Sequence, residues 1–193
     1  MPTPPDAKLL RRLDRLDAAT ERLLDEMSLA EGRALRRPPV QGAWTPLETL
    51  HHLNLAERQS VDYLAYKLAR EAVMPRLGLR DWFAGKAVSL ALASPLKFKA
   101  PPQTDARRPG VETPADVQSL ADEARATRTD LRGLIARLPA EWHGRAVYRH
   151  PTAGRMSLLD MLRLFSVHQR RHAKQIRRAL AQNARYYRRQ EAG

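Results

Sequence analysis

One short signature recurs in front of the leucine-rich parts of this sequence: a Ser or Thr followed three residues later by an Asp or Glu. It occurs at residues 3–6, 45–48, 113–116 and 157–160. The hydroxyl oxygen of such a residue can accept a hydrogen bond from an unpaired backbone N–H at the start of a helix, and the acid can reach back. Three of the signatures have proline second, which is favoured there because its missing N–H would have no partner. Each signature therefore predicts the start of a helix.

The stretches that follow the four signatures are amphipathic at the helical period. In the first stretch, the residues of one apolar stripe are Leu9, Leu13, Leu16, Leu23 and Met27. The pattern predicts helices at about residues 4–31, 46–70, 114–138 and 158–182. Four helices of this length predict an all-α fold, a four-helix bundle formed by a single domain across residues 1–193.

The connection between the second and third predicted helices, residues 71–113, is the longest and permits a crossover. Within it, residues 80–93 form a candidate short helix. Residues 97–114 are rich in Pro, Lys and Arg and predict a surface loop. The tail at residues 185–193 is expected to fray.

Cysteine is absent from the sequence, which excludes disulfide bonds, thiolate metal ligands and a cysteine nucleophile. A metal site must therefore use His, Asp, Glu or backbone oxygen. No apolar run approaches the roughly 18 residues that a membrane span requires, and the first residues lack the pattern of a signal peptide. We therefore expect a cytoplasmic protein without a membrane partner.

The formal net charge of +13 permits two interpretations. A basic protein can bind nucleic acid through the phosphates, or it can carry a solvated basic surface. The denser arginine groups, at residues 170–171, 177–178 and 185–189, all belong to the last predicted helix and its tail. Only Tyr186 and Tyr187 are available there to stack on bases. We therefore expect a solvated surface and no nucleic-acid partner.

Two histidines, His168 and His172, fall in the middle of the apolar face of the last predicted helix. Buried imidazoles are costly unless their ring nitrogens are satisfied. The spacing of four residues lets both rings point at one place, as helix-borne His-x-x-x-His pairs do in metal sites. The alternative is a pair of core histidines that bond to neighbouring side chains.

The second predicted helix offers His51 and His52 as further ligands, and periodicity alone does not choose between them. His52 lies outside the main leucine stripe but shares a second face with Ala56, Ser60 and Tyr63, which a bundle helix can also bury.

Glu57 lies within the leucine stripe of that helix and is a candidate buried carboxylate. It is either a contact to metal or substrate or the partner of an arginine, and His51 is a further candidate for such a contact. His143 and His150 precede the last helix. They are expected to be exposed loop histidines, although that loop can approach the mouth of the site.

Three segments together resemble the DinB/YfiT-like superfamily. They are WTPLETLHH at residues 44–52, HPTAGRMSLLD at residues 150–160 and HQRRH at residues 168–172. The family motif has a Trp at the entry to the second helix, a histidine eight residues later, and a His-x-x-x-His pair on the last helix. The resemblance implies that His52, with His168 and His172, is a metal ligand.

The resemblance also implies a four-helix bundle with a long second crossover, often a homodimer, with an open three-histidine site. That site would hold one divalent ion, nickel or zinc before iron. Some relatives transfer or isomerise small molecules with low-molecular-weight thiols such as bacillithiol, mycothiol or glutathione.

Three functions remain open at this point. The first is a metal-dependent transferase or hydrolase of small molecules that uses a thiol cosubstrate, which suits a chain without cysteine. The second is a non-catalytic helical protein that binds a metal or ligand. The third is a basic, stress-related protein associated with nucleic acid.

Overall fold

The computed structural model describes residues 7–70, 74–93, 101–150 and 154–192. Its elements, in chain order, are α1 (Ala7–Ser28), α2 (Gly32–Arg36), α3 (Pro46–Ala69), α4 (Leu79–Ala93), η1 (Pro102–Thr104), α5 (Val117–Arg137), η2 (Ala140–Trp142), β1 (Tyr148–His150), β2 (Gly154–Met156) and α6 (Leu158–Glu191). The expected all-α class is confirmed. None of the helices described is long and apolar enough to cross a membrane.

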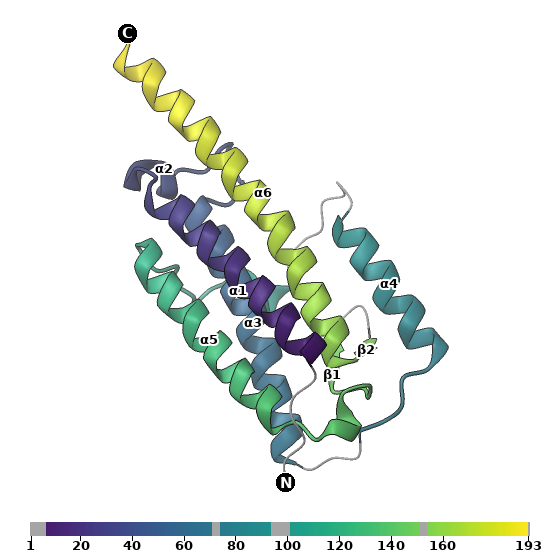
Figure 1. Cartoon of the computed structure of the whole chain (residues 1–193). Coiled ribbons are helices and arrows are strands. Elements are labelled where there is room, and N and C mark those ends of the chain that lie inside the picture. Colours follow the sequence, from purple (N-terminus) through teal and green to yellow (C-terminus); the bar gives the residue numbers. More distant parts are fainter. Residues whose placement is uncertain (1–6, 71–73, 94–100, 151–153, 193) are drawn as a thin grey trace.

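The helices α1, α3, α5 and α6 lie side by side and form the bundle (Figure 1). Both α1 and α3 contact α5 and α6, so the four helices close into a ring. The long connection from α3 to α5 carries α4 along the flank of α6, where the expected short helix is found. The antiparallel pair β1 and β2, which the sequence did not predict, packs between α4 and α6.

Two of the four start signatures cap their helices as expected. The Thr45 Oγ1 accepts a hydrogen bond from the Glu48 backbone N–H at 3.1 Å, and the Glu48 carboxylate accepts one from the Thr45 N–H at 2.7 Å. The Ser157 hydroxyl accepts from the Asp160 N–H at 3.1 Å. The signature at residues 3–6 lies outside the described residues.

The third signature was assigned to the wrong residue. The cap of α5 is Asp116, whose carboxylate accepts a hydrogen bond from the Ser119 N–H at 2.7 Å, and the helix begins at Val117 rather than residue 114. A carboxylate is both a good cap and a favourable charge at the positive end of a helix. Asp116 therefore takes the role expected of Thr113.

The end of α6 differs most from expectation, because the helix continues to Glu191 instead of ending near residue 182. The Asn183 side chain is 1% exposed and donates to the backbone oxygens of Ala34 and Arg37, both at 2.8 Å. The Arg37 guanidinium lies 3.5 Å from the centre of the Tyr186 ring. These contacts hold Asn183, just beyond the expected end of the helix, and Tyr186, within the tail that was expected to fray.

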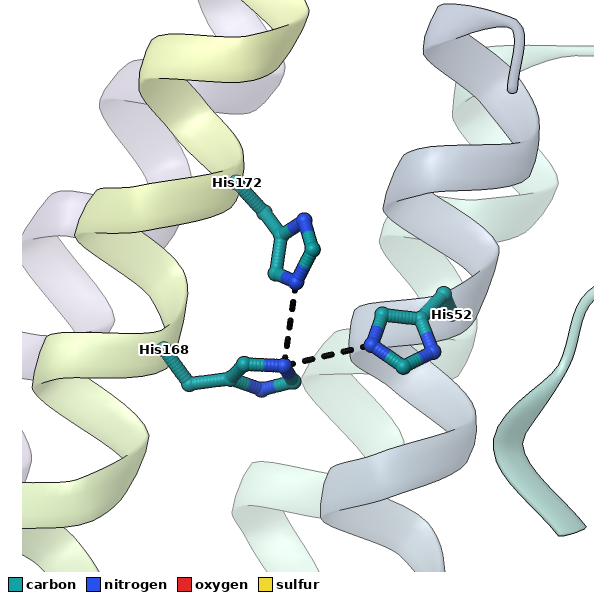
Figure 2. Close-up of side chains that lie close together, drawn as sticks. All are labelled: His52, His168 and His172. Atoms are coloured by element: carbon teal, nitrogen blue, oxygen red, sulfur yellow. Dashed lines mark hydrogen bonds between the residues drawn. The ribbon is translucent and has the colours of Figure 1, made fainter. Parts of the chain in front are cut away.

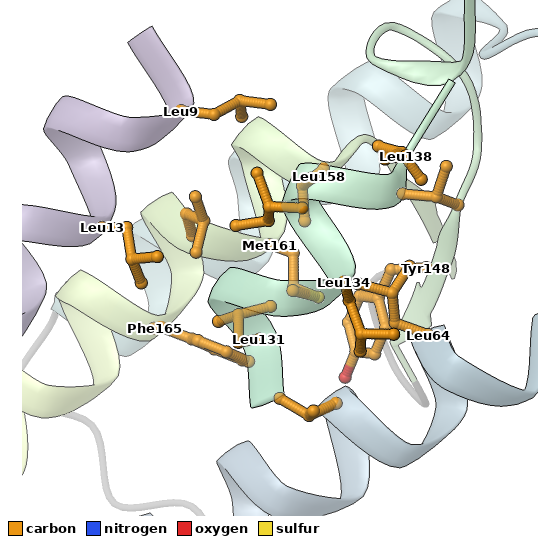
Figure 3. Close-up of a cluster of buried hydrophobic side chains, with 14 of the residues drawn as sticks. Leu9, Leu13, Leu64, Leu131, Leu134, Leu138, Tyr148, Leu158, Met161 and Phe165 are labelled. Atoms are coloured by element: carbon orange, nitrogen blue, oxygen red, sulfur yellow. The ribbon is translucent and has the colours of Figure 1, made fainter. Parts of the chain in front are cut away.

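The core consists of two clusters of buried apolar side chains along the bundle. The cluster in Figure 3 includes Leu13, Leu64, Leu131 and Met161. The second cluster includes the following residues: Leu23, Met27, Leu50, Leu120 and Ile176.

Candidate metal centre

Three imidazoles converge inside the bundle, one from α3 and two from α6 (Figure 2). The Nε2 atom of His168 lies 3.2 Å from Nε2 of His52 and 3.1 Å from Nε2 of His172. Ligand atoms of all three residues lie within 4.8 Å of one another. The structure therefore brings together the three histidines that were predicted as ligands.

Backbone geometry explains how the three rings meet. His168 and His172 are one helical turn apart on the buried face of α6, so their side chains project in nearly the same direction. Helix α3 packs against this part of α6 and presents His52 to the pair. The Trp44 ring, just before α3, lies 4.9 Å from the His52 ring, measured between centres.

The outer nitrogens of two rings are engaged by oxygen acceptors. The His52 Nδ1–H donates to the backbone oxygen of Thr104 at 2.6 Å, and the His172 Nδ1–H donates to Oε1 of Gln175 at 3.0 Å. Because a carbonyl oxygen can only accept, the proton of each neutral ring stays on Nδ1. The Nε2 atoms of His52 and His172 therefore face the site as lone pairs.

These lone pairs cannot all be satisfied within the triad. The Nε2 atom of His168 faces both of the other Nε2 atoms, and it carries at most one proton. Within the triad, at least one of the two buried lone pairs therefore has no donor of its own, which is costly. A cation among the three nitrogens would satisfy all of them at once, so the donor set fits a metal.

The separations of the nitrogens also fit a metal. Metal–imidazole bonds of about 2.0–2.1 Å place two ligand nitrogens roughly 2.8–3.4 Å apart, with octahedral angles at the short end and tetrahedral angles at the long end. The observed 3.2 and 3.1 Å separations fall in this range.

The electrostatics keep the imidazoles neutral, which is the form that binds metals. Burial lowers the pKa of His52, and it lowers the pKa of His168 well below its ordinary value. Burial, together with the charge of His52, lowers the pKa of His172 to about 4. All three rings are therefore uncharged at neutral pH.

The two other candidate contacts, His51 and Glu57, do not belong to the three-residue group. His51 faces α5, with Nδ1 3.7 Å from the Glu123 carboxylate, and neither ring nitrogen has a hydrogen-bond partner within the described part of the chain. Glu57 accepts two hydrogen bonds from the Arg128 guanidinium, at 2.8 and 2.5 Å. This corresponds to the ion-pair alternative for Glu57.

His143 and His150 are partly buried rather than exposed as expected. His150 ends β1, and its ring centre is 6.4 Å from that of Tyr148. Burial is the main cause that lowers the pKa of His168, and the charge of His150 is a smaller one. The strand β1 pairs with β2 and contacts α3.

Sequence reasoning missed two residues that hold the rings, Thr104 and Gln175. Gln175 lies three residues after His172 on the same helix, a spacing that could have indicated the contact. Thr104 acts through its backbone oxygen, which every residue has, so the sequence could not indicate this contact.

The fold and this site define a class: all-α proteins in which facing helices of a bundle present three inward imidazoles to one point. A sequence profile described as the DinB superfamily matches residues 12–176 and spans all three histidines. The chain belongs to the DinB superfamily. Comparison with curated proteins finds no match, and comparison with solved structures finds none.

Proposed function

We propose that this protein binds one divalent metal ion through the Nε2 atoms of His52, His168 and His172. The observation that carries the proposal is the convergence of the three Nε2 atoms while the Nδ1 protons of His52 and His172 are held by Thr104 and Gln175. Imidazole ligands accept nickel, zinc, iron and copper; following the family resemblance, we propose nickel or zinc first and iron next.

We further propose that the protein is a metal-dependent transferase or hydrolase of small molecules, with a low-molecular-weight thiol as cosubstrate. Three protein ligands leave a coordination position open, where a metal can lower the pKa of a bound water or thiol or polarise a carbonyl. Thr104 and Gln175 fix the tautomers of His52 and His172. The Trp44 ring packs against the ring of His52, with 4.9 Å between their centres.

The first experiment is elemental mass spectrometry of the purified protein, compared with His52→Ala and His168→Ala. We expect about one metal ion per chain in the wild type and strongly reduced metal in both variants. His51→Ala is the matched control, because it removes a buried histidine of the same helix outside the triad. A wild-type protein without metal, even after incubation with nickel or zinc, would overturn the proposal.

A non-catalytic metal-binding role is the second candidate. It is supported by the small exposed fractions of His52 and His172, 4% and 9%, which leave little room for a substrate. Assays of thiol-dependent transfer and of hydrolysis separate the two roles. Turnover that is lost in His172→Ala supports the enzyme, and a metal-loaded protein without turnover supports the binding role.

We also propose that the protein forms a homodimer through the outer face of α4. Leu79, Phe83 and Leu90 are 80%, 64% and 71% exposed on that helix. Their spacings of four and seven residues place them on one stripe. Such an exposed apolar stripe can pair with its copy about a two-fold axis.

Sedimentation analysis of Phe83→Lys tests this pairing. We expect a dimer in the wild type and a monomer in the variant. Leu29→Lys is the control, because it changes a side chain that is 90% exposed outside α4. A monomeric wild type would contradict the proposal.

A further inference from the structure

The segment between α4 and α5 contributes an acceptor to the candidate metal centre. The backbone oxygen of Thr104 lies 2.6 Å from Nδ1 of His52. Partners of this kind fix the tautomer and orientation of a metal-binding ring, and their loss typically costs 10- to 100-fold in metal affinity. A backbone oxygen cannot be removed by a side-chain substitution, so its position must depend on the contacts that hold the segment.

The segment around Thr104 is folded compactly on α3. The Thr104 N–H donates to Pro101 O at 3.0 Å, and the Arg107 N–H donates to Oδ1 of Asp105 at 2.9 Å. Thr104 and Ala106 are 7% and 2% exposed. The carbonyl therefore belongs to a short, well-packed turn.

The side chain of Arg107 anchors this turn to the start of α3. Its guanidinium donates to both carboxylate oxygens of Glu48, at 2.5 and 2.7 Å. It also donates to the backbone oxygens of Ala43 at 2.6 Å and Gly42 at 3.2 Å. One side chain thus binds two other segments by four hydrogen bonds.

Both of those segments border His52. Ala43 precedes Trp44, whose ring packs against the His52 ring. Glu48 lies one turn before His52 and closes the capping box with Thr45. Arg107 therefore joins the three parts of the chain that surround the outer side of the His52 ring.

We propose that Arg107 is a positioning residue of the metal centre. It holds the Thr104 oxygen on the His52 Nδ1–H and so keeps the Nε2 lone pair directed at His168 and His172. This inference rests on the proposed metal site, and Arg107 itself touches none of the three ligands in the contacts described. An isolated exposed ion pair would contribute little, but a planar guanidinium that bridges a carboxylate and two carbonyls cannot be replaced by lysine.

The test compares Arg107→Ala and Arg107→Lys with the wild type in the full-length protein. Arg125→Ala is the matched control, because Arg125 also makes a two-bond pair with a carboxylate, that of Glu21, at 3.1 and 2.8 Å between α5 and α1. Cobalt(II) binding is measured by calorimetry and by the visible spectrum. The His52 Nδ1–H resonance is followed by NMR in the metal-free protein.

We expect both Arg107 variants to bind cobalt about 10-fold or more weakly, with an altered spectrum and a shifted or faster-exchanging Nδ1–H resonance. Arg125→Ala is expected to retain the wild-type affinity and resonance. Wild-type affinity and resonance in Arg107→Ala, or full rescue by Arg107→Lys, would overturn the role of the guanidinium.

The NMR measurement separates this inference from the proposed function. If the wild type binds no cobalt, the proposed metal site is wrong. A perturbed His52 Nδ1–H resonance in the Arg107 variants would still support the positioning of the His52 ring by Arg107. If the wild type binds cobalt and the Arg107 variants have the same affinity and resonance, only the positioning role of Arg107 is wrong.

Discussion

The buried ion pair of Glu57 and Arg128 joins α3 to α5. Both side chains are 8% exposed, and the Arg128 guanidinium also donates to Asp17 at 2.8 Å. The guanidinium of Arg128 pairs with both carboxylates. Because Glu57 and Arg128 are buried, removal of either one leaves the other as an unpaired buried charge.

Arg128→Met is therefore expected to lower the free energy of unfolding by about 3–5 kcal/mol. Arg125→Met, which breaks a solvent-exposed pair, should cost about 0–1 kcal/mol. Urea unfolding of the two variants measures the difference. Equal losses would show that the burial of the Glu57 pair has no energetic consequence.

The low pKa of His172 makes the metal-free protein sensitive to acid. Its pKa is about 4 in the folded chain and about 6.5 in the unfolded chain. Between these values the unfolded chain binds a proton that the folded chain does not. The free energy of unfolding therefore decreases as the pH falls through this window.

From pH 7 to pH 5, His172 alone should lower the free energy of unfolding by about 2 kcal/mol. Urea unfolding at the two pH values, for the metal-free wild type and His172→Gln, isolates this contribution. The variant should lose less stability than the wild type. An identical loss would mean that the titration of His172 is not coupled to folding.

Only some residues of the candidate site could be predicted from the sequence. His168 and His172 stood out because ionisable side chains occupied an apolar helix face. The choice of His52 over His51 depended on the family resemblance, since α3 buries residues on more than one face and its periodicity does not separate them. The Thr104 contact was not predictable, because any residue supplies a backbone oxygen.

Among the elements, the start of α5 shows how two adequate caps compete. Thr113 and Asp116 both belong to the preferred capping residues, and the sequence offers no local reason to exclude either. The structure selects Asp116, which leaves residues 114–116 outside the helix.

Asp116→Ala is expected to lower the free energy of unfolding by about 1 kcal/mol, the usual effect of losing a cap. Thr113→Ala should change it by less than about 0.5 kcal/mol. Chemical denaturation of both variants distinguishes the two starts. A larger effect for Thr113→Ala would restore the helix start predicted from the signature.

For the whole molecule, a bound metal would connect α3 to α6, two helices whose ligands lie 116 residues apart in the chain. A ligand that binds only the folded state stabilises it by about 2.7 kcal/mol at 100 times its dissociation constant. We therefore expect a chelator to lower the melting temperature of the metal-loaded wild type. The melting temperature of His168→Ala should not respond to the chelator.

The all-α class followed from the leucine periodicities because each long helix buries a continuous apolar stripe. The short elements α2, β1 and β2 could not be predicted in this way. Each has too few residues to show a periodic pattern, and its conformation is fixed by contacts with other parts of the chain. The same holds for the end of α6, which Asn183 and Tyr186 secure through polar contacts.

The triad has a further consequence for how the helices align. Along α3, His52 lies between Leu50 of one apolar cluster and Leu64 of the other, and along α6 the imidazoles lie between Phe165 and Ile176 in the same way. If either helix slid by one turn, about 5.4 Å, the Nε2 atom of His52 would separate from that of His168, while His168 and His172 would stay together on α6. The layer of histidines between the two apolar clusters thus sets the axial register of α3 against α6. Buried polar residues have the same role in coiled coils.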